Sequence, residues 1–263
     1  MRRRIMIERP GSIVAMVALL LCLFITGANA DVIATIAQVK GSIVAVGTYE
    51  QMRSPRFQFR GTGFAIGDGT LIATNAHVLP ETIDSAHFEV VGILVTGPEH
   101  DNVQFREARR VAVDPGTDLA LLKIDGKPLP ALRIGNSDGV REGQEILFTG
   151  FPLGSALGPY PATHGGMVSA ITPIAIPPAR STQLDPKLLQ RLTIGSFPIF
   201  QLDATAYPGN SGSPVYDAAT GEVVGVINMV FVKGTKESAL TQPSGITYAI
   251  PAKYLQDLVQ KAR

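Results

Sequence analysis

Two short strands are predicted in the stretch Gly61-Thr-Gly-Phe-Ala-Ile-Gly-Asp-Gly-Thr-Leu-Ile-Ala-Thr-Asn-Ala-His77-Val78. Residues 63–66 and 70–74 are short apolar runs, and the Gly-Asp-Gly between them is a turn signal. Two short strands followed by a histidine are therefore expected. Similar runs elsewhere in the chain indicate an all-β fold.

Short strands separated by turn residues recur along the whole chain, which contains 27 glycines and 19 prolines. About a dozen strands with frequent turn signals are typical of a barrel or sandwich. The predicted strands are Val39–Val46, Gly63–Ile66, Thr70–Thr74, His87–Leu94, Arg110–Val113, Leu119–Ile124, Glu145–Thr149, Gly166–Ile171, Phe200–Asp203, Pro214–Tyr216, Val223–Met229 and Thr247–Ile250. A convincing helix is expected only at Pro251–Lys261, and Pro173–Phe197 is expected to be a long surface loop.

The first thirty residues have the features of an export signal. Four arginines precede the apolar run Ile13–Ile25, and Ala28-Asn-Ala30 offers a small-x-small cleavage site. The run is about thirteen residues long, shorter than the roughly 20 of a membrane-spanning helix. We expect residues 1–30 to be a cleaved bacterial signal peptide, by the Sec or the twin-arginine route, and the mature protein to be periplasmic or secreted without an integral membrane span. An uncleaved membrane anchor is the alternative.

The amino-acid composition argues against disulfides, nucleic-acid binding and metal binding. Cys22 is the one cysteine and lies in the signal segment, so no disulfide is expected in the mature protein. Loss of residues 1–30 removes four arginines and one glutamate, which changes the net charge from +1 to −2. A near-neutral chain without basic runs argues against nucleic-acid binding. No metal-ligand pattern is present, so neither a metal nor another cofactor is expected.

Three residues carry chemistry through their order and their local sequence. His77 follows the strand predicted at Thr70–Thr74, Asp118 opens Asp118-Leu-Ala-Leu-Leu-Lys-Ile124, and Ser211 lies in Gly209-Asn-Ser-Gly-Ser-Pro214. A serine hydroxyl becomes a nucleophile when an imidazole takes its proton, and a carboxylate holds that imidazole in the right tautomer. The trio therefore predicts a catalytic triad. Ser213 is the alternative nucleophile, but it lacks a glycine two positions before it.

The serine turn also predicts a site that stabilises negative charge. Gly209 and Gly212 allow backbone conformations that direct amide N–H groups toward one point. The segment Gly209, Asn210 and Ser211 is the predicted oxyanion hole, with the N–H groups of Gly209 and Ser211 as its donors.

Glycine, proline and charged residues concentrate in Asp125–Gly143, where we place a link between two halves. The predicted division is residues 1–30, a first half over 31–130 and a second half with the terminal helix over 131–263. His77 and Asp118 fall in the first half and Ser211 in the second. The active site is therefore expected in a cleft between the halves.

The triad blocks carry a family resemblance. Thr74-Asn-Ala-His-Val78, Thr117-Asp-Leu-Ala-Leu121 and Gly209-Asn-Ser-Gly-Ser-Pro214 resemble those of trypsin-like serine proteases, and particularly the bacterial HtrA (Deg) group. The likeness spans about residues 35–255 and includes stretches between the blocks. It implies two packed six-stranded antiparallel β-barrels, with His77 as general base, Asp118 as its orienting partner and Ser211 as nucleophile.

Two departures limit what the resemblance implies. No PDZ modules follow the protease domain before Arg263, and an oligomer is possible but not implied. Ser213 and Pro214 replace the Gly and Ala usual in the HtrA group. Asn210 stands where many trypsin-like enzymes have the Asp that pairs with a new N-terminus, so activation through that salt bridge is not expected.

The resemblance also suggests which residues bind substrate. The primary pocket is expected to be lined by Thr205, Ala206, Tyr207, Pro208, Ile227, Asn228, Met229 and Val230. None is charged, so cleavage after small or medium uncharged residues is expected. Asp203 is expected to be a strand-end acceptor, and His87, His100 and His164 are expected to be surface or packing residues; a basic-residue pocket at Asp203 and a second functional imidazole at His164 are the alternatives.

The sequence thus predicts an exported serine endopeptidase that acts on peptides or unfolded proteins. The alternative is a peptide-binding or chaperone-like module that keeps the protease scaffold without its chemistry, because fold and function are separable.

Overall fold

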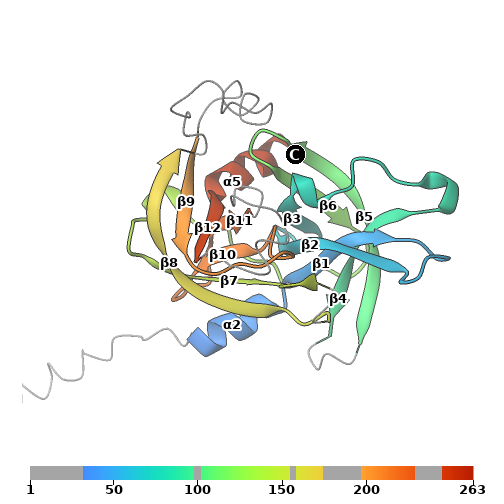
Figure 1. Ribbon diagram of the computed structural model, residues 1–263, viewed down its shortest axis with the longest axis horizontal. Coiled ribbons are helices and arrows are strands. Elements are labelled where there is room, and N and C mark those ends of the chain that lie inside the picture. Colours follow the sequence, from blue (N-terminus) through green and yellow to red (C-terminus); the bar gives the residue numbers. More distant parts are fainter. Residues whose placement is uncertain (1–31, 98–101, 155–157, 174–196, 229–244, 263) are drawn as a thin grey trace, which may run out of the picture.

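The structure is a computed structural model that describes residues 32–97, 102–154, 158–173, 197–228 and 245–262. Within these residues the chain forms two closed barrels of six antiparallel strands each (Figure 1). The strands are β1 (Ile43–Tyr49), β2 (Phe57–Ile66), β3 (Leu71–Asn75), β4 (Val90–Thr96), β5 (Val103–Asp114) and β6 (Leu119–Ile124) in the first barrel, and β7 (Glu145–Gly150), β8 (Ala162–Pro173), β9 (Pro198–Asp203), β10 (Pro214–Asp217), β11 (Val223–Ile227) and β12 (Ile246–Pro251) in the second. The helices are α2 (Val32–Lys40), α5 (Ala252–Lys261) and the short 3-10 helices η1 (Ala76–Val78), η2 (Ser85–His87) and η3 (Ser137–Gly139).

The first barrel is closed in the order β1-β2-β3-β6-β5-β4. The predicted strands Gly63–Ile66 and Thr70–Thr74 lie in β2 and β3, which pair as a hairpin with Phe64 opposite Ala73. Gly67 and Gly69 in the connecting turn have φ values of 63° and 81°, a region that favours glycine. The hairpin therefore delivers His77 to the end of β3, in η1.

The second barrel is closed in the order β10-β11-β12-β9-β8-β7. Its interior is apolar and includes Phe148, Val168, Leu202 and Ile227, each fully buried. The serine turn lies between β9 and β10, so both its ends are attached to this barrel.

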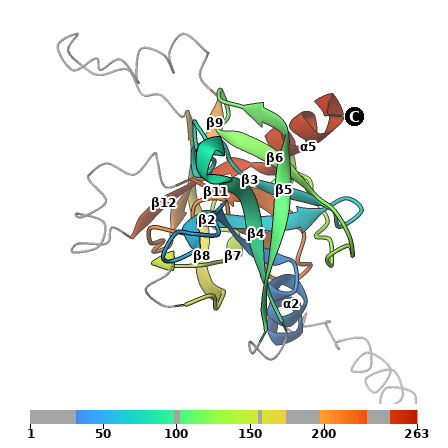
Figure 2. The same ribbon diagram turned by 90° about the vertical axis from the view of Figure 1, so that its right-hand side faces the viewer.

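A third apolar cluster joins the two barrels and helix α5. It contains Phe64 and Leu119 of the first barrel, Tyr216 and Val226 of the second, and Leu255 of α5, all fully buried. Burying a large apolar side chain contributes about 1.5–3 kcal/mol. Helix α5 contacts β5 and β6 as well as β11 and β12, and it lies at the opposite end of the molecule from α2 (Figures 1 and 2). The barrels are thus held together by a continuous core, which confirms the predicted double barrel with a short C-terminal helix.

Some local expectations are wrong. Residues 32–40 form helix α2, whereas the sequence predicts a strand from Val39 and a helix only at the C-terminus. The β-branched residues of this segment are typical of strands, but Ile33 is 79% exposed and Val39 is the buried residue of the helix. A single anchoring contact with the core outweighs a weak intrinsic preference here.

The predicted strand His87–Leu94 begins too early. His87 belongs to η2, and Phe88 has a φ of 56°, so β4 starts at Val90. The cause is Asp84, whose carboxylate accepts hydrogen bonds from the N–H groups of Ala86 and His87 and thereby forms a turn. His100 and most of the predicted loop Pro173–Phe197 lie outside the described residues, as does the signal segment.

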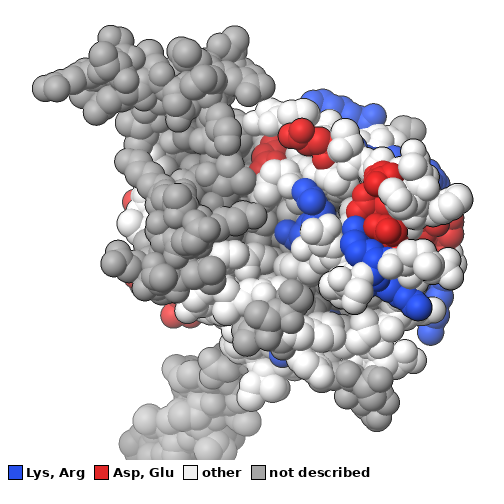
Figure 3. Space-filling model, turned by 45° about the vertical axis from the view of Figure 1, so that its right-hand side comes forward, with Lys and Arg blue, Asp and Glu red and all other residues white. Residues whose placement is uncertain are grey.

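Charge is mixed on the face drawn in Figure 3, where positive and negative side chains lie side by side. Over the described ranges, no helix is both long and apolar enough to cross a membrane. The same residues contain no group of three or more His, Cys, Asp or Glu side chains suited to holding a metal ion.

Candidate active site

His77 and Asp118 are in direct contact through two hydrogen bonds. The Nδ1 atom of His77 lies 2.6 Å from Oδ2 of Asp118, and the backbone N–H of His77 donates to Oδ1 at 2.9 Å. One carboxylate therefore fixes both the ring and the backbone of the histidine. With Nδ1 protonated toward Asp118, the neutral ring presents Nε2 as a proton acceptor. The His77 side chain is 32% exposed, so a substrate bound at the surface can come close to its ring.

Asp118 itself has an unusual backbone. Its φ is 56°, in the left-handed region that aspartate tolerates better than most residues. Its carbonyl accepts hydrogen bonds from the N–H of Ala76 at 3.1 Å and from Nδ2 of Asn75 at 3.0 Å. The segment just before His77 therefore stabilises the strained residue that orients His77.

The second barrel contributes a residue to this pair. Asn228 follows β11, and its Nδ2 donates to Oδ2 of Asp118 at 2.6 Å. The sequence assigns Asn228 to the wall of the substrate pocket, whereas the structure places its amide on the Asp118 carboxylate. Because the two residues are 110 positions apart, only the packing of the barrels reveals this contact.

The serine turn requires both of its glycines. Gly209 has a φ of 102° and Gly212 a φ of 86°. A Cβ atom would lie 2.3 Å from the Phe151 carbonyl oxygen at Gly209, and 2.1 Å from the Thr62 carbonyl oxygen at Gly212. Any larger residue at either position would therefore displace the backbone around Ser211.

The turn lies beside the His77 segment. A Cβ atom on Gly61 would meet the Val78 side chain at 2.6 Å and the Ser211 carbonyl oxygen at 3.0 Å. Because glycine has no side chain, Gly61 allows the residue after His77 and the turn that carries Ser211 to lie close together. No hydrogen bond between the Ser211 hydroxyl and His77 is present among the described contacts.

The two serines of the turn differ in environment. Ser213 is fully buried, and its Oγ faces Gly150, where an added Cβ atom would lie only 1.9 Å away. Ser211 retains 6% exposure. An external substrate can therefore meet Ser211 rather than Ser213.

The amide groups of the turn have different partners. The N–H of Asn210 donates to the Tyr207 carbonyl at 2.9 Å, whereas those of Gly209 and Ser211 have no backbone acceptor in the described part of the chain. The carbonyl of Pro208 accepts from the Leu153 N–H at 2.7 Å. Because a peptide unit is planar and trans, this bond directs the Gly209 N–H to the opposite side. Gly209 and Ser211 are thus the available donors of the predicted oxyanion hole.

The sequence matches a known protein family. A family model described as a trypsin-like peptidase domain matches residues 61–226. The chain belongs to this family. The matched range contains the segments of His77, Asp118 and Ser211.

Curated relatives of this trypsin-like peptidase include two named "Probable periplasmic serine endoprotease DegP-like". The relative from Pseudomonas fluorescens is 32% identical over 214 residues, which cover 79% of this chain and 37% of the relative. The relative from Marinomonas sp. is 32% identical over 203 residues, covering 77% and 35% respectively. The chain therefore spans little more than a third of the length of these relatives.

Solved structures support the same group. "HtrA-type protease AlgW with decapeptide" has 25% sequence identity and a TM-score of 0.62, covering 88% of this chain and 67% of that chain. "HtrA-type protease AlgW with tripeptide" has 26% identity and a TM-score of 0.60, covering 88% and 62%. The resemblance to the HtrA group that the triad blocks indicate is confirmed.

The residues assigned to the pocket of this trypsin-like peptidase differ in exposure. Ala206 and Ile227 are buried in the second-barrel core, while Thr205, Tyr207 and Pro208 are half-buried. Asp203 is exposed at the end of β9. Met229 and Val230 lie outside the described residues.

His164 is a packing residue next to this wall. Its ring stacks on Phe148 at 5.0 Å between centroids and lies 6.1 Å from the ring of Tyr207. Burial lowers the pKa of His164, so the ring is neutral near pH 7. It therefore brings no positive charge to the wall.

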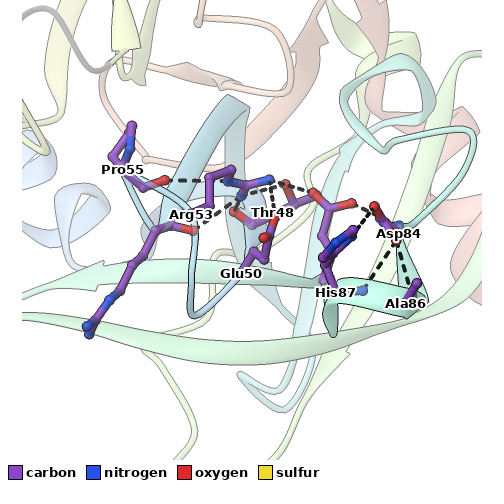
Figure 4. A network of polar contacts seen from close by, with 9 residues as sticks. Thr48, Glu50, Arg53, Pro55, Asp84, Ala86 and His87 are labelled. Carbon is purple, nitrogen blue, oxygen red and sulfur yellow. Dashed lines mark hydrogen bonds and ion pairs between the residues drawn. The ribbon is translucent and has the colours of Figure 1, made fainter.

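A polar network holds the segment that follows η1 of this trypsin-like peptidase (Figure 4). Arg53, in the β1–β2 connection, forms an ion pair with Glu89 at 2.8 Å and donates to the Thr48 carbonyl at 2.8 Å. Hydrogen bonds from the Thr48 hydroxyl, the Asp84 N–H and Arg53 lower the pKa of Glu89 to about 2. His87 pairs with Asp84 at 2.7 Å, which raises the pKa of His87. This second histidine–aspartate pair lies at the surface and stabilises the segment that follows His77.

Proposed function

We propose that the protein is a serine endopeptidase in which His77 is the general base, Asp118 its orienting partner and Ser211 the nucleophile. The observation that carries the proposal is the double hydrogen bond between Asp118 and His77. Such a bond holds the imidazole in one tautomer and stabilises the imidazolium that forms when it takes a proton.

The reaction follows from these roles. The Ser211 Oγ attacks the peptide carbonyl while its proton passes to Nε2 of His77. The N–H groups of Gly209 and Ser211 stabilise the negative oxygen of the tetrahedral intermediate. His77 then gives the proton to the leaving amine, which produces an acyl-enzyme and frees the first product. Water, activated in turn by His77, hydrolyses the ester and restores Ser211.

Labelling with a fluorophosphonate tests this proposal, because only an activated serine reacts irreversibly. The wild-type protein should gain one adduct, located on Ser211 by peptide mass mapping. Ser211→Ala should gain none, and the matched variant Ser213→Ala should be labelled like the wild type. A folded wild-type protein that stays unlabelled would favour the peptide-binding module instead.

The substrates we propose are peptides and unfolded proteins cut after small or medium uncharged residues. Thr205, Ala206, Tyr207 and Pro208 support this specificity because none is charged, and the nearby carboxylate of Asp203 is exposed. The relatives are named periplasmic, and residues 1–30 have signal-peptide features, so we further propose that the protein is exported to the periplasm or secreted.

A panel of fluorogenic peptides that differ only in the residue before the cleaved bond should show the highest kcat/KM for Ala, Val or similar side chains. Arg and Lys peptides should be at least about tenfold poorer, since none of the described residues assigned to the pocket carries a carboxylate to pair with them. A preference for Arg or Lys that is lost in Asp203→Asn would contradict the neutral pocket.

A further inference from the structure

Thr62 on β2 of the first barrel is a polar residue that contacts the serine turn of the second barrel. It is fully buried. Its hydroxyl donates to the Gly209 carbonyl at 2.7 Å and accepts from the Phe151 N–H at 3.0 Å. Its backbone N–H donates to the Ser211 carbonyl at 2.8 Å. One threonine thus binds the backbone on both sides of Asn210.

The bonds to Gly209 and Ser211 fix the orientation of the turn. Glycine at position 209 would otherwise allow the peptide unit after it to rotate, because it lacks the steric limits of other residues. Holding the carbonyls of Gly209 and Ser211 fixes the 209–210 and 211–212 peptide units. The Ser211 N–H belongs to the 210–211 unit between them and the Gly209 N–H to the 208–209 unit just before them, so both available oxyanion donors lie in units that adjoin the held ones.

The side chain of Asn210 does not supply this restraint. Asn210 is fully buried, yet neither Oδ1 nor Nδ2 has a hydrogen-bond partner in the described part of the molecule. The sequence already excludes the salt bridge that a carboxylate would form at this position. The turn is instead held by backbone hydrogen bonds, such as that from the Asn210 N–H to the Tyr207 carbonyl, and by Thr62, which contacts it from the first barrel.

Thr62 also contacts the segment whose Leu153 N–H bonds to the Pro208 carbonyl and thereby orients the Gly209 N–H. Phe151 donates to the Thr62 hydroxyl, and two residues later Leu153 donates to the Pro208 carbonyl. Thr74 in turn donates to the Thr62 carbonyl at 2.7 Å, so β3 holds β2 in place. The chain of contacts runs from the strand before His77 to the oxyanion turn.

We propose that Thr62 is a positioning residue for catalysis, which aligns the Gly209 and Ser211 N–H groups with the developing oxyanion once the barrels have packed. This inference rests on the proposed function. Its hydroxyl acts through the turn and does not touch the substrate. Loss of the hydroxyl should therefore reduce kcat and leave KM nearly unchanged.

The test compares Thr62→Val, which removes the hydroxyl at nearly constant volume, with Thr62→Ser, which keeps it. The matched control is Thr149→Val: Thr149 is equally buried, and its hydroxyl bonds to Tyr216 and Thr163 at 2.8 Å, away from the turn. Steady-state kinetics with a fluorogenic peptide are measured well below the melting temperature of every variant. Since loss of one oxyanion donor costs about 10²–10³ in rate, misalignment in Thr62→Val should lower kcat about 10–100-fold.

Thr62→Ser should restore kcat to within about threefold of wild type, and Thr149→Val should keep kcat despite a lower melting temperature. If Thr62→Val does not fold, Thr62→Ala removes the hydroxyl without new bulk, and its second-order rate constant for fluorophosphonate labelling, corrected for the folded fraction, replaces kcat. An active wild type with unchanged kcat or labelling rate in Thr62→Val and Thr62→Ala would overturn this role alone. Equal losses in Thr62→Val and Thr149→Val, or failure of Thr62→Ser to rescue, would also overturn it. A folded wild type that neither cleaves nor labels would instead refute the proposed function.

Discussion

Replacing Ser211 with alanine should lower kcat for peptide hydrolysis by on the order of 10⁴–10⁶, because the covalent route is lost and only binding and the oxyanion donors remain. The side chain is small and nearly buried, so the fold should survive the change. The measurement is cleavage of a fluorogenic peptide by enzyme purified in parallel with the wild type, with the melting temperature as a check on folding.

The control for this variant is Ser213→Ala. The Ser213 hydroxyl faces Gly150 inside the second barrel, so its loss should leave kcat within about tenfold of wild type. Full activity in Ser211→Ala, or loss of activity confined to Ser213→Ala, would show that the nucleophile has been assigned wrongly.

Replacing Asp118 with asparagine should lower kcat by about 10⁴ near neutral pH. The Asp118 carboxylate receives the His77 N–H on one oxygen, and the His77 ring and the Asn228 amide on the other. An asparagine offers one oxygen and one NH₂ group, so in either orientation an NH₂ faces a donor. The imidazole is then driven toward the wrong tautomer or away from its position.

Asp84→Asn is the matched control, since it changes the other histidine–aspartate pair, His87–Asp84, by the same chemistry. Its kcat should stay at the wild-type value. The pH–rate profiles of both variants should be recorded with their melting temperatures. Retention of more than about a tenth of wild-type kcat in a folded Asp118→Asn would contradict the role given to Asp118.

The sequence predicts best where a short apolar run is bordered by turn signals. Strand β6 has the predicted bounds Leu119–Ile124, because its buried apolar residues are bordered by a turn. Strand β5 is predicted only as Arg110–Val113 but runs from Val103 to Asp114. Its charged residues, such as Arg106 and Glu107, obscure the alternation, and pairing with β4 and β6 extends the strand beyond what its side chains indicate.

In the candidate site, too, some features can be predicted from the sequence and others cannot. The segments of His77, Asp118 and Ser211 are recognisable because each has a local sequence suited to its role. The contacts of Asn228 with Asp118 and of Thr62 with Gly209 join residues 110 and 147 positions apart. They depend on how two barrels dock, a tertiary property that local patterns do not contain.

Helix α5 lies against strands β5 and β6, so residues near the end of the chain complete the surface of the barrel that is synthesised first. During synthesis from the N-terminus, the apolar surface of the first barrel stays partly uncovered until these residues have been made. The hydrogen bond between Asp118 and Asn228 likewise forms only after both barrels are made. A newly made copy is therefore expected to gain activity only after the second barrel, which carries Ser211, has packed against the first.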